Sequence, residues 1–313
     1  MKDNKNKVIV ILGTTASGKT GLGVRLAHGL GGEIISADSR QVYKGMDIGT
    51  GKDLAEYEID GQKIAYHLID VADPKERYSL ADFQKEAFAA IDDILKRGQL
   101  PIIVGGTGQY LEAVVENYKL SDAEPNKELR EKLEKADIDE IFAQIKEINS
   151  KFASNINESD RKNKRRLIRY LEVLQASGGD FEPLRRPQES QYDFLMLGLT
   201  HPKEILSERI DKRLEQRLEE EGMVEEVQEL NRNGLSFERL EEFGLEYKYI
   251  SKYLKDELEY EEMKEKLAQE IKKFAKKQMT WYKRWEKRGR KIHWVEDKDD
   301  ANNLIENFLG KNA

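Results

Sequence analysis

A glycine-bounded loop near the start of the chain limits the folds that it can adopt. Its sequence is Gly13-Thr14-Thr15-Ala16-Ser17-Gly18-Lys19-Thr20. The apolar run Val8–Leu12 precedes the loop, and a helical pattern of leucines over Lys19–Gly29 follows it. Between a buried strand and a helix, this spacing is the P-loop pattern, whose backbone N–H groups turn inward around phosphate oxygens. In that pattern Lys19 neutralises phosphate charge, and the Thr20 hydroxyl can ligate Mg²⁺.

The P-loop indicates a diphosphate or triphosphate ligand, but it does not specify ATP. A P-loop NTPase also holds its Mg²⁺ with an Asp that follows an apolar strand. Here the apolar run Pro101–Val104 is followed by glycines. The run Tyr66–Asp70 does end in an aspartate, Asp70, for which a metal-related role and a structural role are equally open.

Strand and helix patterns alternate in the first third of the chain, which is typical of a parallel sheet covered by helices. The amphipathic helix Leu80–Arg97 belongs to this alternation, and residues 203–289 are almost entirely helical in pattern. We therefore predict an α/β fold, a P-loop NTPase-like parallel sheet covered by helices. The expected strands are Val8–Leu12, Glu33–Ala37, Tyr66–Asp70, Pro101–Val104, Phe194–Leu199 and, as an edge strand, Ile292–Val295.

The pattern changes after Tyr118, and this change predicts the domain organisation. Residues 121–160 are charged, helical in pattern and poor in large apolar side chains. We expect them to form a small helical insertion domain. Residues 1–120 and 161–313 would then form the P-loop core.

Charge and composition narrow the class of partner. The net charge of -7 argues against general binding to nucleic acid, because phosphate contacts need cations. The cations are nevertheless clustered, in residues 161–169 and in residues 272–291, and each cluster could be a solvated helix face or an RNA-binding face. There are no cysteines and no apolar run long enough to cross a bilayer, so we expect no membrane partner and a cytoplasmic location.

A second polar segment, Ser36-Ala37-Asp38-Ser39-Arg40-Gln41, directly follows the second expected strand. Ligands of open α/β sheets bind outside the carboxyl ends of the strands, so Asp38 is expected beside the P-loop. A carboxylate there can act as a general base, or it can cap a helix, and position alone does not separate the two roles.

Taken together, these segments resemble the tRNA dimethylallyltransferase family. The P-loop and the Asp38 segment match that family, and so do several later blocks in the family order. The resemblance covers most of the chain outside the insertion. The later blocks are Met46-Asp47-Ile48-Gly49-Thr50, His67-Leu68-Ile69-Asp70, Gly105-Gly106-Thr107-Gly108, Arg165-Arg166-Leu167-Ile168-Arg169 and Lys276-Lys277-Gln278-Met279-Thr280-Trp281.

The resemblance implies transfer of a dimethylallyl group from dimethylallyl diphosphate to N6 of the adenine at position 37 of a tRNA anticodon loop. It implies that the P-loop holds the diphosphate with Mg²⁺, that Asp38 is the base, and that Thr107 lies near the reacting centre. Lys248 stands where the family often has an arginine and could contact the diphosphate. The expected contacts to the tRNA anticodon stem-loop are the insertion and Asp38, Ser39, Arg40, Gln41, Arg165, Arg166, Leu167, Ile168 and Arg169.

Two other functions compete with this one. An isopentenyltransferase of the same fold could act on free adenine nucleotide, but it would need neither basic cluster. A small-molecule P-loop kinase would use ATP and would not need the Asp38 segment. We expect the tRNA enzyme, acting as a monomer.

Overall fold

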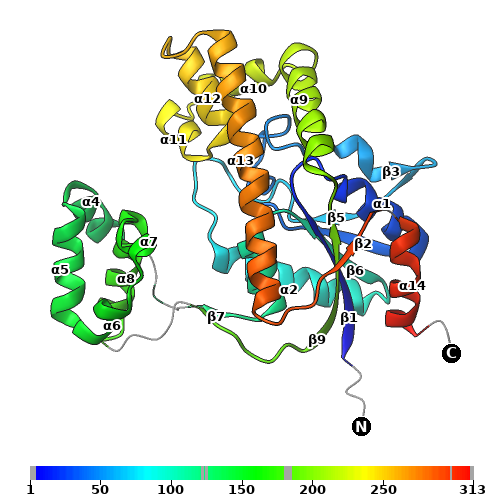
Figure 1. The fold of residues 1–313 in the computed structure, drawn as a ribbon, viewed down its shortest axis with the longest axis horizontal. Helices are drawn as coiled ribbons and strands as arrows, with labels where there is room; N and C mark the ends of the chain where they lie inside the picture. Colours follow the sequence, from blue (N-terminus) through cyan, green and yellow to red (C-terminus); the bar gives the residue numbers. More distant parts are fainter. Residues whose placement is uncertain (1–4, 121–122, 124–125, 180–184, 297, 311–313) are drawn as a thin grey trace. The chain divides into compact units, whose positions relative to one another are not determined.

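The computed structural model describes residues 5–120, 123, 126–179, 185–296 and 298–310. The contacts between its residues divide the chain into two compact units (Figure 1). Unit 1 contains Met1–Val115 and Ser190–Ala313, and unit 2 contains Glu116–Glu189. Unit 1 carries the sheet and the P-loop, and each unit is described by itself below.

Unit 1 is built on a six-stranded parallel sheet in the order β10-β9-β1-β6-β2-β5. The central strand β1 pairs with β6 on one side, where Ile9 faces Ile102, and with β9 on the other. This confirms the predicted fold class. The strands are β1 (Asn6–Gly13), β2 (Gly32–Ser36), β5 (Tyr66–His67), β6 (Leu100–Gly105), β9 (Tyr192–Leu199) and β10 (His293–Val295).

One expected strand is shorter than its apolar pattern suggested. Tyr66–Asp70 was expected to be extended throughout, but β5 ends at His67. Leu68 and Asp70 have φ angles of 62° and 58°, in the left-handed region that strands do not use. The chain therefore turns away from the sheet just before Asp70.

Helices cover both faces of the sheet, and each face has its own core. Helix α1 (Lys19–Leu30) and helix α14 (Lys298–Leu309) contribute Leu22, Leu26 and Ile305 to one core. Helix α2 (Leu80–Lys96) and helix α3 (Gly108–Val115) pack on the opposite face, in the larger core. The β1 side chains from Val8 to Leu12 are completely buried between them, as expected for a central parallel strand.

The remaining helices of unit 1 come from the second half of the chain. They bring Leu214, Val227 and Tyr282 into the larger core. A short 3₁₀ helix, Leu54–Tyr57, and a small hairpin, β3 (Glu58–Ile59) and β4 (Gln62–Lys63), follow the Asp38 segment. The helices are α9 (Lys203–Glu219), α10 (Met223–Arg232), α11 (Phe237–Glu242), α12 (Leu245–Leu254) and α13 (Tyr260–Lys287).

Unit 2 is helical and wider than the expected 121–160, because helix α8 belongs to it. Leu167, Leu171 and Leu174 of α8 share a buried core with Leu133 and Ile141. The strands β7 (Lys119–Leu120) and β8 (Arg185–Arg186) pair antiparallel where the chain enters and leaves the unit. The helices are α4 (Lys127–Lys135), α5 (Ile138–Ile148), α6 (Ser150–Asn155), α7 (Glu158–Arg161) and α8 (Lys164–Ala176).

Among the residues that the structure describes, no helix combines the length and the apolar character that a bilayer crossing requires.

Candidate active site

The P-loop connects β1 to α1, as its sequence context predicted. Its backbone uses left-handed conformations at Ala16 and Gly18, with φ angles of 61° and 86°. A Cβ atom on Gly13 would lie 2.6 Å from the carbonyl oxygen of Leu199, so only glycine allows β9 to pass this closely. The loop and the N-terminus of α1 therefore form the anion-binding geometry that the motif requires.

Helix α13 fastens the P-loop to the loop that follows β6. Gln278 Oε1 accepts a hydrogen bond from the Thr15 backbone N–H at 2.8 Å, and Gln278 Nε2 donates to the Gly106 carbonyl at 2.9 Å. One turn later, the Tyr282 hydroxyl lies 3.1 Å from both the Gly13 and the Gly106 carbonyl oxygens. These two buried side chains fix the carboxyl ends of β1 and β6 relative to each other.

Four cations line a cavity beside the P-loop, together with four carboxylates. The cations are Lys19, Arg40, Arg213 and Arg217, and the carboxylates are those of Asp38, Asp53, Glu56 and Glu246. Desolvation by burial lowers the pKa of Lys19 to about 8, against the opposing attraction of Asp38. Burial and the neighbouring Arg217 lower the pKa of Arg213 to about 10. Because Arg40 and Arg217 are already paired with Glu246 and Asp53, Lys19 and Arg213 are the cations best placed to receive an anion beside the P-loop.

Arg213 and Arg217 lie one turn apart on α9, and the guanidinium group of each donates hydrogen bonds to another residue of unit 1. The Arg213 guanidinium donates to the Thr15 hydroxyl. Arg217 donates to both carboxylate oxygens of Asp53 at 3.0 Å, and its side chain is almost completely buried. Both arginines are therefore positioned before any ligand arrives.

Asp38 lies in the same cavity, at the end of β2. Its Oδ1 accepts a hydrogen bond from the Arg40 backbone N–H at 3.0 Å, so it forms a local turn rather than a helix cap. Thr107 is adjacent through Ser39, whose backbone N–H donates to Thr107 Oγ1 at 3.0 Å. The structure thus brings Asp38, Thr107 and the P-loop together, as the sequence predicted.

The cavity has an empty volume of about 790 Å³, part of which is open to solvent. Its walls come from the P-loop, the segment after β2, the end of β6, and helices α9, α12 and α13. The lining residues are Thr15, Ala16, Gly18, Lys19, Thr20, Asp38, Arg40, Gln41, Gly49, Thr50, Gly51, Asp53, Glu56, Tyr57, Val104, Gly105, Arg213, Arg217, Glu246, Phe274 and Gln278.

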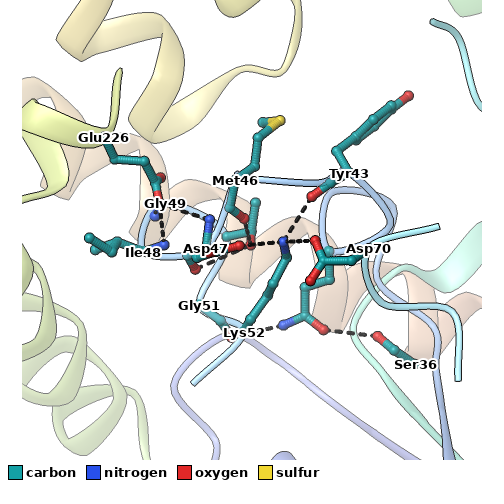
Figure 2. A network of polar contacts seen from close by, with 12 residues as sticks. Ser36, Tyr43, Met46, Asp47, Ile48, Gly49, Gly51, Lys52, Asp70 and Glu226 are labelled. Atoms are coloured by element: carbon teal, nitrogen blue, oxygen red, sulfur yellow. Dashed lines mark hydrogen bonds and ion pairs between the residues drawn. The ribbon is translucent and has the colours of Figure 1, made fainter. Parts of the chain in front are cut away.

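A buried lysine organises the segment that forms one wall of this cavity. Figure 2 shows Lys52 Nζ surrounded by the Tyr43 carbonyl, at 2.8 Å, and the carboxylates of Asp47 and Asp70. The Lys52 side chain is 1% exposed, so its charge is balanced inside the protein. Asp70 is therefore a counter-ion of Lys52, and it is not among the described residues that line the cavity, which favours its structural role.

A carboxylate from helix α10 holds the other side of the same segment. Glu226 accepts hydrogen bonds from three consecutive backbone N–H groups, those of Asp47, Ile48 and Gly49, at 2.6–3.0 Å (Figure 2). Glu226 also accepts from the Tyr247 hydroxyl at 2.8 Å. The wall residues Gly49, Thr50 and Gly51 are thus fixed through Glu226 and Lys52.

The other residues expected to contact tRNA from unit 1 are already bonded within it. The Arg40 guanidinium pairs with Glu246, and its side chain is 16% exposed. Gln41 Nε2 donates to the Gly51 carbonyl at 2.8 Å, and Gln41 Oε1 accepts from the Ser36 hydroxyl. In this structure Arg40 and Gln41 support the cavity wall.

The segment of unit 2 that was expected to contact tRNA, residues 165–169, lies on α8. Some of its side chains are exposed and others are buried. Arg165 and Arg166 are exposed, and Arg166 pairs with Asp160. Leu167 and Ile168, at 0% and 3% exposure, lie in the core of unit 2. This corrects the expectation that their side chains meet RNA, because helix periodicity turns them inward. Arg169 is half-buried against Glu172.

Lys248 does not line the cavity. Its Nζ lies 5.9 Å from the centre of the Tyr249 ring, and Arg213 and Arg217 occupy the cationic wall where Lys248 was expected. Neither arginine was predicted from the sequence, because their contacts to Thr15 and Asp53 span more than 160 residues. Their four-residue spacing on a helical pattern was the available signal.

Comparisons with known proteins place these features in a family. The model of the IPP transferase family matches residues 41–285, and the isopentenyl transferase model matches residues 6–70. The chain is 45% identical over 304 residues to tRNA dimethylallyltransferase 1 of Syntrophus aciditrophicus, covering 97% of each chain.

Two solved structures of transferases that act on tRNA are also similar to this chain. The tRNA isopentenylpyrophosphate transferase of Bacillus halodurans has a TM-score of 0.68 and 34% identity, covering 98% of this chain and 96% of that one. A eukaryotic dimethylallyltransferase acting on tRNA has a TM-score of 0.75 and 26% identity, covering 98% of this chain and 77% of that one.

Proposed function

This chain belongs to the IPP transferase family, and from that premise we propose that it is a tRNA prenyltransferase. It transfers a dimethylallyl group from dimethylallyl diphosphate to N6 of the adenine at position 37, next to the anticodon, and gives N6-isopentenyladenosine. The observation that carries the proposal is the single cavity in which Lys19, Arg213 and Arg217 face the same space as Asp38. Such a site can hold an anionic leaving group and a proton acceptor at once.

The acceptor half of the reaction is assigned to Asp38. An exocyclic adenine amine is a weak nucleophile, because its lone pair is delocalised into the ring. As the bond between N6 and the first carbon of the dimethylallyl group forms, the Asp38 carboxylate takes the amine proton. Thr107, whose hydroxyl accepts from Ser39, would fix the backbone around Asp38 beside the reacting carbon.

The donor half is assigned to the P-loop. The bond between that carbon and the diphosphate oxygen breaks as N6 attacks, and the electron pair leaves with the diphosphate. Lys19, Arg213 and the N–H groups at the start of α1 stabilise the charge that grows on the leaving group.

The residues present fit a magnesium ion. The Thr20 hydroxyl lines the cavity and offers the hard oxygen ligand that Mg²⁺ prefers, while the diphosphate would supply others. Mg²⁺ held there would neutralise part of the diphosphate charge. Among the described residues, no group of three or more acidic, His or Cys side chains could hold a metal without the substrate.

The proposed macromolecular partner is the tRNA anticodon stem-loop. Single-stranded loops allow a base to leave its stack at low cost, as a closed cavity requires. Arg165 and Arg166 of unit 2 are exposed cations suited to phosphate contacts. We propose that the enzyme acts as a monomer, in the cytoplasm where its acceptor is found.

The deciding experiment offers labelled dimethylallyl diphosphate to the enzyme with tRNA, AMP or ATP as acceptor, and measures ADP release in parallel. We expect label in tRNA alone and no ADP. Label in AMP or ATP would assign the free-nucleotide enzyme instead. ADP released in proportion to turnover would assign a kinase.

A further inference from the structure

Thr15, in the first half of the P-loop, has its backbone N–H and its hydroxyl engaged by side chains of two distant helices, α13 and α9. Its backbone N–H donates to Gln278 Oε1 at 2.8 Å. Its hydroxyl accepts from the Arg213 guanidinium. In this chain, therefore, Thr15 offers no N–H to a bound phosphate.

This matters because a P-loop binds a phosphate chain along its length. The helix end and the lysine hold one phosphate, and the backbone N–H groups of the loop follow the next ones. Every N–H group that is already bonded shortens the anion that the loop can cradle. The Gln278 side chain also lines the cavity, so its amide oxygen presents partial negative charge beside the loop.

The position of Gln278 is fixed from its other end. Its Nε2 donates to the Gly106 carbonyl at 2.9 Å, and the side chain is only 6% exposed. A Cβ atom on Gly106 would lie 2.4 Å from Gln278 Nε2, so a glycine is needed there for the amide to fit. An amide can accept from Thr15 through its oxygen and donate to Gly106 through its nitrogen without carrying a charge.

We propose that Gln278 is a specificity-determining residue that restricts this P-loop to a diphosphate. Because Gln278 occupies the Thr15 N–H, the rest of the loop has space and hydrogen-bond donors for two phosphate groups but not for a third. The proposal rests on the proposed function, in which the P-loop holds the diphosphate of the prenyl donor. It explains how a chain with a complete P-loop motif can discriminate against nucleoside triphosphates.

The test measures binding of pyrophosphate and of tripolyphosphate to the full chain by calorimetry, with Mg²⁺ present. Tripolyphosphate carries more charge, so charge alone would favour it. We expect the wild type to bind pyrophosphate at least about tenfold more tightly. Gln278→Ala frees the Thr15 N–H and should reduce that preference about tenfold. Gln269→Ala, at an exposed position of the same helix, is the matched control and should keep it.

The ratio of the two affinities separates specificity from simple structural damage. If Gln278→Ala weakens both anions equally and the ratio is unchanged, Gln278 only supports the fold, and the proposal is overturned. A wild type that binds both anions equally overturns it as well, even if Gln278→Ala does not fold. A wild type that binds neither anion would instead contradict the proposed role of the P-loop.

Discussion

At the scale of single residues, a substitution at Asp38 can separate the chemical role of the side chain from its structural role. Its Oδ1 accepts from the Arg40 backbone N–H, and an asparagine oxygen can accept that same bond. We therefore expect Asp38→Asn to keep the fold and the affinity for pyrophosphate, while kcat falls by about two to four decades because the base is lost. Steady-state kinetics with tRNA at neutral pH measures this. A kcat within about threefold of wild type would mean that Asp38 only shapes the turn.

Lys19 carries the second prediction at this scale, because its lowered pKa of about 8 falls in an accessible range. Only the protonated amine attracts a diphosphate, so affinity for pyrophosphate should fall as pH rises through about 8. Above that point the loss should approach about tenfold per pH unit. Lys19→Arg stays protonated and should remove this dependence. Calorimetry from pH 7 to 9 compares the two proteins, and identical pH profiles would contradict the assignment.

The residues of the site differ in how far the sequence alone could reveal them. The P-loop and Asp38 were predictable, because a local motif and the rule for ligands at strand ends were sufficient. Gln278, Arg213 and Glu226 were not assigned roles, because each acts on a segment more than 150 residues away in the chain. Such contacts depend on how α9, α10 and α13 pack, and no short pattern encodes that.

At the scale of elements, helix α10 positions one wall of the cavity through Glu226. Glu226→Ala would leave three backbone N–H groups without their carboxylate acceptor, which should lower the free energy of unfolding by about 1–3 kcal/mol. It should also raise the KM for the prenyl donor, because Gly49–Gly51 lose their support. Glu225→Ala, the exposed neighbour on the same helix, is the control and should change neither. Equal effects of the two substitutions would contradict this role.

Helix α8 gives the second prediction at this scale. Replacing Arg165 and Arg166 with Ala should weaken tRNA binding and flatten its salt dependence, by about one unit of slope for each phosphate that the protein no longer neutralises. Lys146→Ala, an exposed cation on α5, tests whether any surface charge of unit 2 has the same effect. Binding titrations at several salt concentrations measure the slope. An unchanged slope would identify this face of α8 as solvated surface.

Element boundaries show where periodicity was informative and where it was not. The strands around the P-loop were predicted because their apolar runs are buried on both faces. The strand at Tyr66–Asp70 was predicted too long, because left-handed backbone at Leu68 and Asp70 has no side-chain signature. The residues of helix α8 were assigned to the core domain, since their sequence does not say which core the leucines join.

At the scale of the whole molecule, unit 2 is inserted through a narrow connection. The Gln188 backbone N–H donates to the Glu116 carbonyl at 3.1 Å, and β7 pairs with β8 next to them. Among the residues that the structure describes, none in the two cores of unit 1 comes from unit 2. Replacing residues 121–184 with a short Gly-Ser turn should therefore preserve the folding of unit 1.

Because the two units have separate cores, the shortened protein should keep the function of unit 1 and lose that of unit 2. The shortened protein should bind pyrophosphate within about threefold of the full chain, because the described residues that line the cavity all lie in unit 1. Its KM for tRNA should rise at least about tenfold, since the shortened protein has no exposed arginines of α8. Calorimetry and transfer assays measure the two effects. An unchanged KM for tRNA would mean that unit 2 does not take part in recognition.

The order of the strands also has a consequence for biosynthesis. Strand β1 emerges first from the ribosome, but its neighbour β9 follows some 180 residues later, and Gln278 and Tyr282, which fasten the P-loop, come later still. Unit 2 is built from contacts close in sequence and can fold while the rest is being translated. The nascent chain thus carries a complete P-loop sequence long before that loop has its final partners, and it gains a working site only after helix α13 has been synthesised.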